Sequence, residues 1–151
     1  MEKQIWKPPE WWYIKKRPTN DNQYLENMSR VIFQAGLNWT VVDKKWTAIT
    51  EAFKGFSVEK VASFTDSDAN RLKKNSGIIR NEGKIRAIIQ NAEKFKEIQS
   101  QHGSFQKYLD SLDKSNNYEK VVEELSNKFK WLGPSSARIF LHTVGEKITH
   151  A

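Results

Sequence analysis

Two short segments of the sequence combine a glycine turn with residues suited to binding a nucleic acid. In the first, Gln34-Ala35-Gly36-Leu37-Asn38-Trp39, an amide, a turn, a leucine and a tryptophan follow one another closely. An apolar side chain on such a turn can wedge between base steps, and an aromatic ring can stack on an extruded or cationic base. On the residues alone, packing of Leu37 and Trp39 into the core at a helix junction is the simpler interpretation.

The second segment runs from Lys130 to Ala137 and predicts a hairpin between two helices. Gly133 permits a tight turn and Pro134 suits the first turn of a helix, so unpaired backbone N–H groups meet the positive end of a helix dipole. Side chains beside the turn supply hydroxyl donors and positive charge for the phosphates of one DNA strand. They are Lys128, Lys130, Ser135, Ser136 and Arg138. A plain helical corner with a Gly-Pro break explains the pattern equally well.

The composition favours a soluble intracellular protein with a polyanionic partner. The 151 residues suffice for one ordinary domain, and 25 Lys and Arg against 18 Asp and Glu give a formal charge of +7. Such a charge favours DNA or RNA without choosing between them. No apolar run approaches the roughly 18 residues of a membrane-spanning helix, and the N-terminus lacks the apolar core of a secretion signal. We therefore expect a cytoplasmic, nucleoid-associated protein with no membrane partner.

Metal and thiol chemistry are disfavoured by the residue types present. The sequence contains no cysteine, which excludes disulfides, thiolate nucleophiles, iron–sulfur clusters and Cys-ligated zinc. Its three histidines are scattered and leave little for any other transition-metal site. We expect neither a metal nor an organic cofactor.

Residues 1–20 differ from the rest of the chain and predict an irregular arm. Three prolines break any periodicity there, and large aromatic residues stand beside cations. The aromatic residues are Trp6, Trp11, Trp12 and Tyr13. They could stack on bases, although anchoring the arm onto the core is the commoner role of such residues.

From residue 21 to the C-terminus, the sequence predicts a single all-α domain. Apolar residues recur three or four positions apart, which is typical of amphipathic helices. A first helix ends at Gly36, a second starts at Asn38 or Thr40, and the last runs from about Ser135 to Val144. Between them we expect helices after Ser57, Thr65, Gly83 and Ser104, the long one closed by Gly103, and a polar loop at 113–117. The expected architecture is a compact bundle of eight or nine helices with a helix–hairpin–helix motif.

Several stretches resemble the DNA-3-methyladenine glycosylase I family. They are residues 34–39, Lys44-Lys45, residues 53–62 and above all Gly77-Ile78-Ile79-Arg80-Asn81-Glu82-Gly83-Lys84-Ile85. The resemblance covers residues 24–95 in register and resumes over residues 129–145. It implies a helix–hairpin–helix DNA glycosylase, a class that flips a damaged base out of the duplex and hydrolyses its N-glycosidic bond.

Carried over to this sequence, the resemblance implies three groups of DNA-contacting residues. Gly36 and Leu37 would fill the gap left in the duplex. The base-binding residues would be Trp39, Gln34 and one aromatic residue of the arm, with Tyr13 first and Trp12 or Trp11 as alternatives. The residues that hold the DNA backbone would be Lys130, Trp131, Gly133, Ser135, Ser136 and Arg138.

Three features depart from the family pattern. Val31 stands where the family has a base-reading glutamate, so base recognition must differ. The Cys/His zinc site that ties together the termini of familiar bacterial members is missing, with only His150 near a matching place. After the hairpin glycine the only carboxylate side chain is that of Glu146, and Ser135 replaces the lyase lysine of the wider superfamily, which disfavours Schiff-base chemistry.

Asp43 is the candidate catalytic residue that could replace the missing acids. It lies four residues after Trp39, hence on the same face of a helix that begins by Asn38. We expect its carboxylate to steady a cationic base or an oxocarbenium-like transition state, or to orient water. An exposed carboxylate paired with neighbours such as Lys44 or Thr47 explains it equally well.

The remaining charged residues have simpler interpretations. Glu26 and Arg30 are four apart and predict a surface ion pair. Lys84 and Arg86 could contact phosphate, but solvated side chains are the commoner outcome. His142 stands in an apolar helix and is better explained as a packed histidine than as a base.

The sequence therefore predicts a monomeric, monofunctional DNA N-glycosylase that removes alkylated purines such as 3-methyladenine from double-stranded DNA in base excision repair. Alkylation at N3 or N7 makes the purine cationic and a good leaving group, so aromatic stacking and water could suffice for hydrolysis. The main alternative is a protein of the same fold that binds lesions without cutting. An RNA-binding or interaction protein is a third possibility, which the charge permits.

Overall fold

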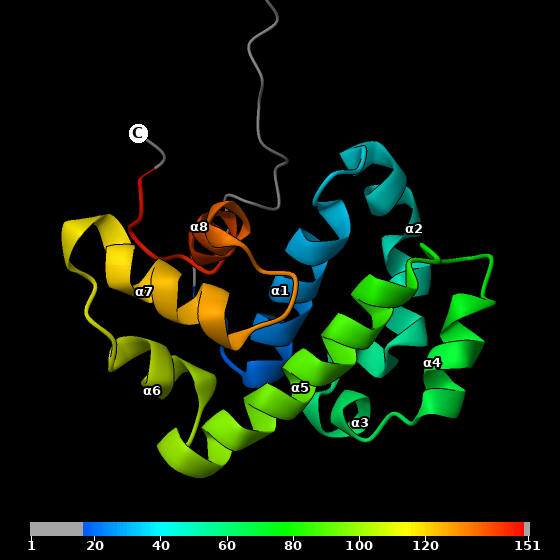
Figure 1. Ribbon diagram of the computed structural model, residues 1–151, viewed down its shortest axis with the longest axis horizontal. Coiled ribbons are helices and arrows are strands. Elements are labelled where there is room, and N and C mark those ends of the chain that lie inside the picture. The colour runs from blue at the N-terminus through cyan, green and yellow to red at the C-terminus, as the bar shows by residue number, and fades with distance from the viewer. Residues whose placement is uncertain (1–16, 150–151) are drawn as a thin grey trace, which may run out of the picture.

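The computed structural model describes residues 17–149, and every regular element in that range is a helix (Figure 1). The elements are α1 (Asp21–Gln34), α2 (Trp39–Ala52), the 3₁₀ turn η2 (Lys54–Phe56), α3 (Val58–Ala62), α4 (Asp66–Lys73), α5 (Glu82–His102), α6 (Phe105–Asp110), α7 (Ser115–Lys128) and α8 (Pro134–Thr143). The all-α prediction is confirmed. None of these helices is both long enough and apolar enough to cross a membrane.

Side-chain caps fix where most of the helices begin. The capping residues are Asn20 for α1, Asn38 for α2, Ser57 for α3, Thr65 for α4, Asn81 for α5 and Ser104 for α6. Thr65 and Asp68 form the reciprocal capping box that their spacing predicts. Gly103 closes α5 with a φ of 89°, a conformation that glycine adopts without strain. Helix starts are therefore largely encoded by local side chains.

Three boundaries differ from the sequence prediction. Asn81 accepts a hydrogen bond from the Lys84 N–H at 3.1 Å and starts α5 at Glu82, so Gly83 lies inside the first turn instead of preceding it. α7 begins at Ser115, inside the expected polar loop, and its residues 116–118 all have positive φ. α3 ends at Ala62, and Phe64 packs from the following turn.

α5 is the central element of the fold. It crosses the middle of Figure 1, with α6, α7 and α8 on one side and α2, α3 and α4 on the other. α1 packs against α5 and also contacts α2 and α8. Because α5 has elements packed on both sides, its residues can contact both the turn after α1 and the turn before α8.

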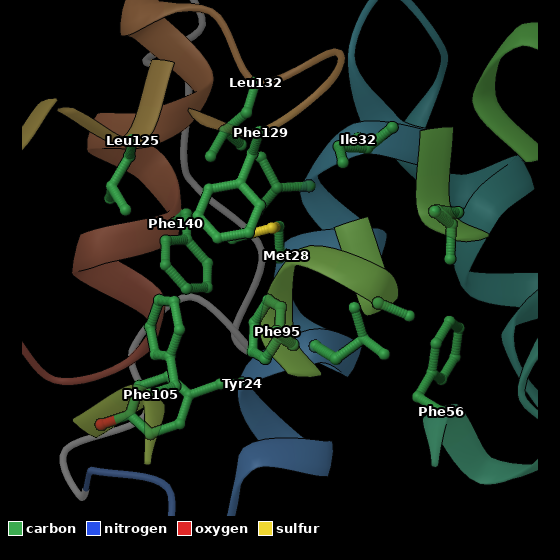
Figure 2. Packing of buried hydrophobic residues seen from close by; sticks show 14 of the residues in the cluster. Tyr24, Met28, Ile32, Phe56, Phe95, Phe105, Leu125, Phe129, Leu132 and Phe140 are labelled. Carbon is green, nitrogen blue, oxygen red and sulfur yellow. The ribbon is translucent and has the colours of Figure 1, made fainter. Parts of the chain in front are cut away.

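One continuous apolar core fills the space between these helices. On the side of α6 and α8, the rings of Phe95 and Phe105 stack with centroids 4.6 Å apart. The Tyr24 ring is tilted against that of Phe105, with centroids 4.8 Å apart (Figure 2). On the side of α2, Trp46 stacks on Phe56 at 5.4 Å. Offset stacking of this kind adds to the stability gained by burying the rings.

Candidate functional site

The turn between α1 and α2, residues 35–37, is called the wedge turn here. Gly36 has a φ of 76°, and a Cβ added to it would meet nothing within 4 Å, so the backbone conformation and not crowding favours glycine. Leu37 follows with 42% of its surface exposed, which is large for an apolar residue. Leu37 is therefore a surface residue and not a core residue of the helix junction.

Gln34, at the end of α1, carries a buried amide with unmet hydrogen-bonding capacity. Its residue is 5% exposed, and neither Oε1 nor Nε2 has a hydrogen-bond partner within the described residues. The Trp46 indole N–H of α2 is also buried without an acceptor there. Because unpaired polar groups are costly to bury, these groups require ordered water or a ligand to supply the missing hydrogen bonds.

Asp43 lies on α2, one turn after Trp39. Its Oδ1 accepts a hydrogen bond from an Arg30 Nη at 2.6 Å, and the Arg30 guanidinium lies 5.0 Å from the centroid of the Trp46 ring. The predicted pairs of Arg30 with Glu26, and of Asp43 with Lys44 or Thr47, are thus replaced by an ion pair between α1 and α2. The side chain of Asp43 remains 45% exposed and open to a ligand.

Lys84 is buried, contrary to the expectation of a solvated or phosphate-bound side chain. Its residue is 3% exposed, and Nζ donates to the carbonyl oxygens of Ala35 at 2.7 Å and Phe33 at 3.2 Å. Burial lowers the pKa of the Lys84 ammonium from its ordinary value. Arg86 is held by Glu82 at 3.2 Å and Asp66 at 2.8 Å.

The turn between α7 and α8, residues 129–133, is called the hairpin turn. α8 begins at Pro134, no side chain caps its N-terminus, and Ser135 is exposed there. The buried amide of Asn91 on α5 fixes the turn: Asn91 accepts from the Lys130 N–H at 2.8 Å and donates to the Lys130 carbonyl at 3.1 Å. Residues 129–133 thus join α7 to α8, an order of elements consistent with the predicted helix–hairpin–helix motif.

Trp131 and Arg138, which are both predicted to bind the DNA backbone, lie in different surroundings. Trp131 is 53% exposed and has a φ of 59°, and one edge of its ring packs on Gly83, where an added Cβ would come within 2.8 Å of it. Arg138 instead donates to the carbonyl of Asn117 at 3.3 Å, near the opposite end of α7. Its guanidinium is therefore directed away from the hairpin turn.

Ion pairs join the two ends of the described chain. Arg17 binds Asp110 through two hydrogen bonds of 2.6 and 3.1 Å, and Lys114 lies 2.8 Å from Asp110 and 2.6 Å from Glu146. We call these four residues the terminal ion cluster. Ion pairs thus connect residues near both ends of the described range. The hydrogen bond from Arg17 is the main reason that the pKa of Asp110 is lowered.

Some predicted residues are not placed in the site by the structure. Tyr13, Trp12, Trp11 and His150 lie outside the described residues. Val31 is buried in the core at 2% exposure, and within residues 17–149 no three His, Asp or Glu side chains form a group that could hold a metal ion.

Sequence reasoning missed the roles of Lys84 and Asn91, although a signal was present. Both residues fall on the same helical stripe as the buried residues Ile88 and Phe95, at spacings of three and four. A polar residue on an apolar stripe is a candidate for a buried hydrogen bond.

The helical fold described above is similar to that of solved DNA glycosylases. A 3-methyladenine DNA glycosylase I from Staphylococcus aureus has a similar structure, with a TM-score of 0.76, 25% identity, and coverage of 89% of this chain and 82% of that one. A variant of 3-methyladenine DNA glycosylase I solved in complex with 3-methyladenine gives a TM-score of 0.75, 26% identity, and coverage of 87% and 80%.

The chain belongs to the methyladenine glycosylase family, whose sequence profile matches residues 9–146. It is similar to the DNA-3-methyladenine glycosylase of Haemophilus influenzae, with 39% identity over 80 residues, which are 52% of this chain and 43% of that protein. The aligned part spans less than half the length of the curated relatives that the chain matches.

Proposed function

We propose that this protein is a monofunctional DNA N-glycosylase that flips alkylated purines such as 3-methyladenine out of double-stranded DNA and excises them by hydrolysis. The observation that carries the proposal is the buried amide of Gln34, which has no hydrogen-bond partner among the described residues and lies three residues before the exposed Leu37 of the wedge turn. A flipped purine would supply the missing donors and acceptors, while an apolar side chain would occupy the space that the base leaves. The proposal makes both features parts of one binding event.

Each side chain then has a distinct task. Leu37 enters the base stack, Trp39 stacks on the extruded ring, and the Gln34 amide hydrogen-bonds to its polar edge. The exposed start of α8, with Ser135, Ser136 and the hairpin turn, binds phosphates through backbone N–H groups and hydroxyls. These contacts are electrostatic or apolar and require no cofactor.

Hydrolysis follows from the charge of the alkylated base. The bond between C1′ and the purine nitrogen breaks, and its electron pair stays on the cationic purine, which leaves as a neutral base. The oxygen of a water molecule bonds to C1′ and its proton passes to solvent or to the Asp43 carboxylate. Arg30 fixes Oδ1 of that carboxylate at 2.6 Å, so Asp43 would act by orienting water or stabilising positive charge at C1′.

A second function, lesion binding without excision, is favoured by one feature. Val31 replaces the base-reading glutamate that the family resemblance implies, and the candidate carboxylate, Asp43, already has a cationic partner. Such a protein would show the same preference for damaged DNA but would release no base.

The test is to incubate the protein with alkylated duplex DNA and to identify the liberated bases by mass spectrometry. Release of 3-methyladenine supports the proposal, and a protein that binds the DNA but liberates no base contradicts it. Gln34→Leu keeps the size of the side chain and removes its polar atoms. The excision rate should therefore fall about fivefold, which corresponds to the net free energy of one hydrogen bond. Gln101→Leu, at an exposed position of α5, is the matched control and should leave the rate unchanged.

A further inference from the structure

Lys84 contacts residues of both the wedge turn and the hairpin turn. Its Nζ hydrogen-bonds to Ala35, the first residue of the wedge turn, at 2.7 Å, and lies 5.9 Å from the centroid of the Trp131 ring. Trp131 also packs on the adjacent Gly83. The start of α5 therefore contacts both turns.

The wedge turn has few other ties to the rest of the fold. Its remaining backbone hydrogen bonds within the described chain run back onto α1, from Ala35 N to the carbonyls of Val31 and Ile32 and from Leu37 N to that of Gln34. Gly36 has open space around it, and Leu37 is exposed. Packing alone therefore leaves the direction of the turn weakly determined, and Lys84 supplies the hydrogen bond from another element.

The carbonyl groups that Lys84 binds are those left over at the end of a helix. The last carbonyls of α1 have no N–H partner further along the helix, and they carry the negative end of its dipole. Within the described residues, Lys84 has no carboxylate in ion-pair contact, so carbonyl oxygens alone balance its charge. A lysine buried in this way destabilises the fold because it loses hydration. A contribution to stability therefore does not explain its position.

We propose that Lys84 is a positioning residue for base flipping, which locks the wedge turn at a fixed distance and direction from the hairpin turn. This inference rests on the proposed function, because it assigns Leu37 to the base stack and the hairpin turn to the phosphates. With the phosphates held at the hairpin turn, Leu37 reaches the stack only if the wedge turn keeps its place. Preorganised geometry of this kind affects the transition to the flipped state more than the encounter with DNA.

A double-mutant cycle tests the proposal. Lys84→Met keeps the length of the side chain and removes the donor, and Leu37→Ala removes the apolar side chain of the wedge turn. The measured quantities are the single-turnover excision rate and the preference for a duplex with a tetrahydrofuran abasic analogue over an intact duplex. Each single change should lower both by about tenfold, and the double variant should be no worse than the more affected single variant, because the two act on one step.

Three controls separate this role from a general loss of structure. Lys96→Met removes an exposed lysine of the same helix, paired with Glu59 at 3.7 Å, and should change neither quantity. Thermal unfolding should show that Lys84→Met folds, and its affinity for intact duplex should stay within about twofold. If Lys84→Met does not fold, Lys84→Gln, which keeps a shorter donor, is taken through the same cycle.

Failure of this inference can be told apart from failure of the proposed function. If the unmodified protein neither releases a base nor prefers the abasic duplex, the proposed function is wrong. If it does both, and the losses from Lys84→Met and Leu37→Ala multiply in the double variant, Lys84 acts independently of the wedge turn and this inference is overturned. An unchanged rate in folded Lys84→Met overturns it as well.

Discussion

The terminal ion cluster and the Lys84 junction, which consists of Lys84 and the carbonyl groups of Phe33 and Ala35, each hold a lysine against oxygen acceptors, but they balance its charge in different ways. In the cluster, Lys114 faces carboxylates at 2.6 and 2.8 Å. Burial lowers its pKa, but this effect is outweighed by its hydrogen bond to Asp110 and its ion pair with Glu146. At the junction, the Lys84 ammonium faces carbonyl oxygens, and its pKa is lowered by burial.

This difference indicates what each region contributes. A cation whose pKa is raised in the folded state favours folding in its charged form, whereas a cation whose pKa is lowered opposes it. The cluster therefore acts on stability. The junction carries a cost in stability and fixes the position of a turn on which the proposed activity depends.

Removing a cation from the cluster should produce the largest change in stability. Lys114→Met leaves the Glu146 carboxylate, whose side chain is 6% exposed, with Arg17 at 3.9 Å as its nearest cation. We expect a loss of about 2 kcal/mol in the free energy of unfolding, below the value for a fully buried pair because Lys114 is partly exposed. Urea denaturation measures it.

A matched change within α7, the helix that Lys114 precedes, provides the comparison. Lys120→Met removes an exposed lysine that lies 3.5 Å from Asp113, and it should alter the free energy of unfolding by less than about 0.5 kcal/mol. Equal losses for the two variants would show that the cluster contributes no more than an ordinary surface ion pair.

The ion pair between Arg30 and Asp43 has the same length as that between Lys114 and Glu146, 2.6 Å in each case, but we expect it to serve chemistry. Asp43→Asn should lower the excision rate for methylated purines at least about tenfold, because a neutral amide stabilises positive charge less well. Its affinity for DNA should be nearly unchanged. Single-turnover excision and a binding titration on the same duplex measure the two quantities.

Asp66→Asn is the control for this substitution. Asp66 also pairs with an arginine, Arg86 at 2.8 Å, but lies at the start of α4. The excision rate of the Asp66→Asn variant should match that of the unmodified protein. An undiminished rate in Asp43→Asn would show that Asp43 takes no part in the mechanism. The positive charge of the alkylated base would then be enough to make it a leaving group.

The contrast between the two regions also marks what the sequence could predict. Helix starts were predictable, because capping depends on side chains a few positions apart, as at Asn38 and Thr65. The hydrogen-bond partners of Lys84 were not, because they depend on how α1 meets α5 across about 50 residues of chain. Local periodicity carries no information on contacts between residues that far apart in the chain.

Charge pairing was harder to predict than the helices themselves. Helical spacing correctly places Glu26 one turn from Arg30, yet Arg30 pairs across a helix boundary with Asp43. Likewise, nothing in the spacing of Arg17, Asp110 and Glu146 indicates that they meet. Pairs distant in sequence are decided by packing, so the candidate catalytic residue could be suggested from the sequence while its partner could not.

The smallest predicted effect is a dependence of stability on acidic pH that belongs to the cluster and not to the junction. The pKa of Asp110 is lowered from its ordinary value of 3.8, mainly by the hydrogen bond from Arg17. Its stabilisation is therefore fully present above about pH 4 and is lost as the pH falls through the lower folded-state pKa, where the unfolded chain binds more protons. Because the carboxyl is partly exposed, the loss should stay below about 1 kcal/mol. Asp110→Asn should flatten the fall in unfolding free energy between about pH 4 and pH 2, whereas Lys84→Met should leave that slope as it is; a slope unaffected by Asp110→Asn would mean that Arg17 holds this carboxylate no more tightly in the folded protein than in the unfolded chain.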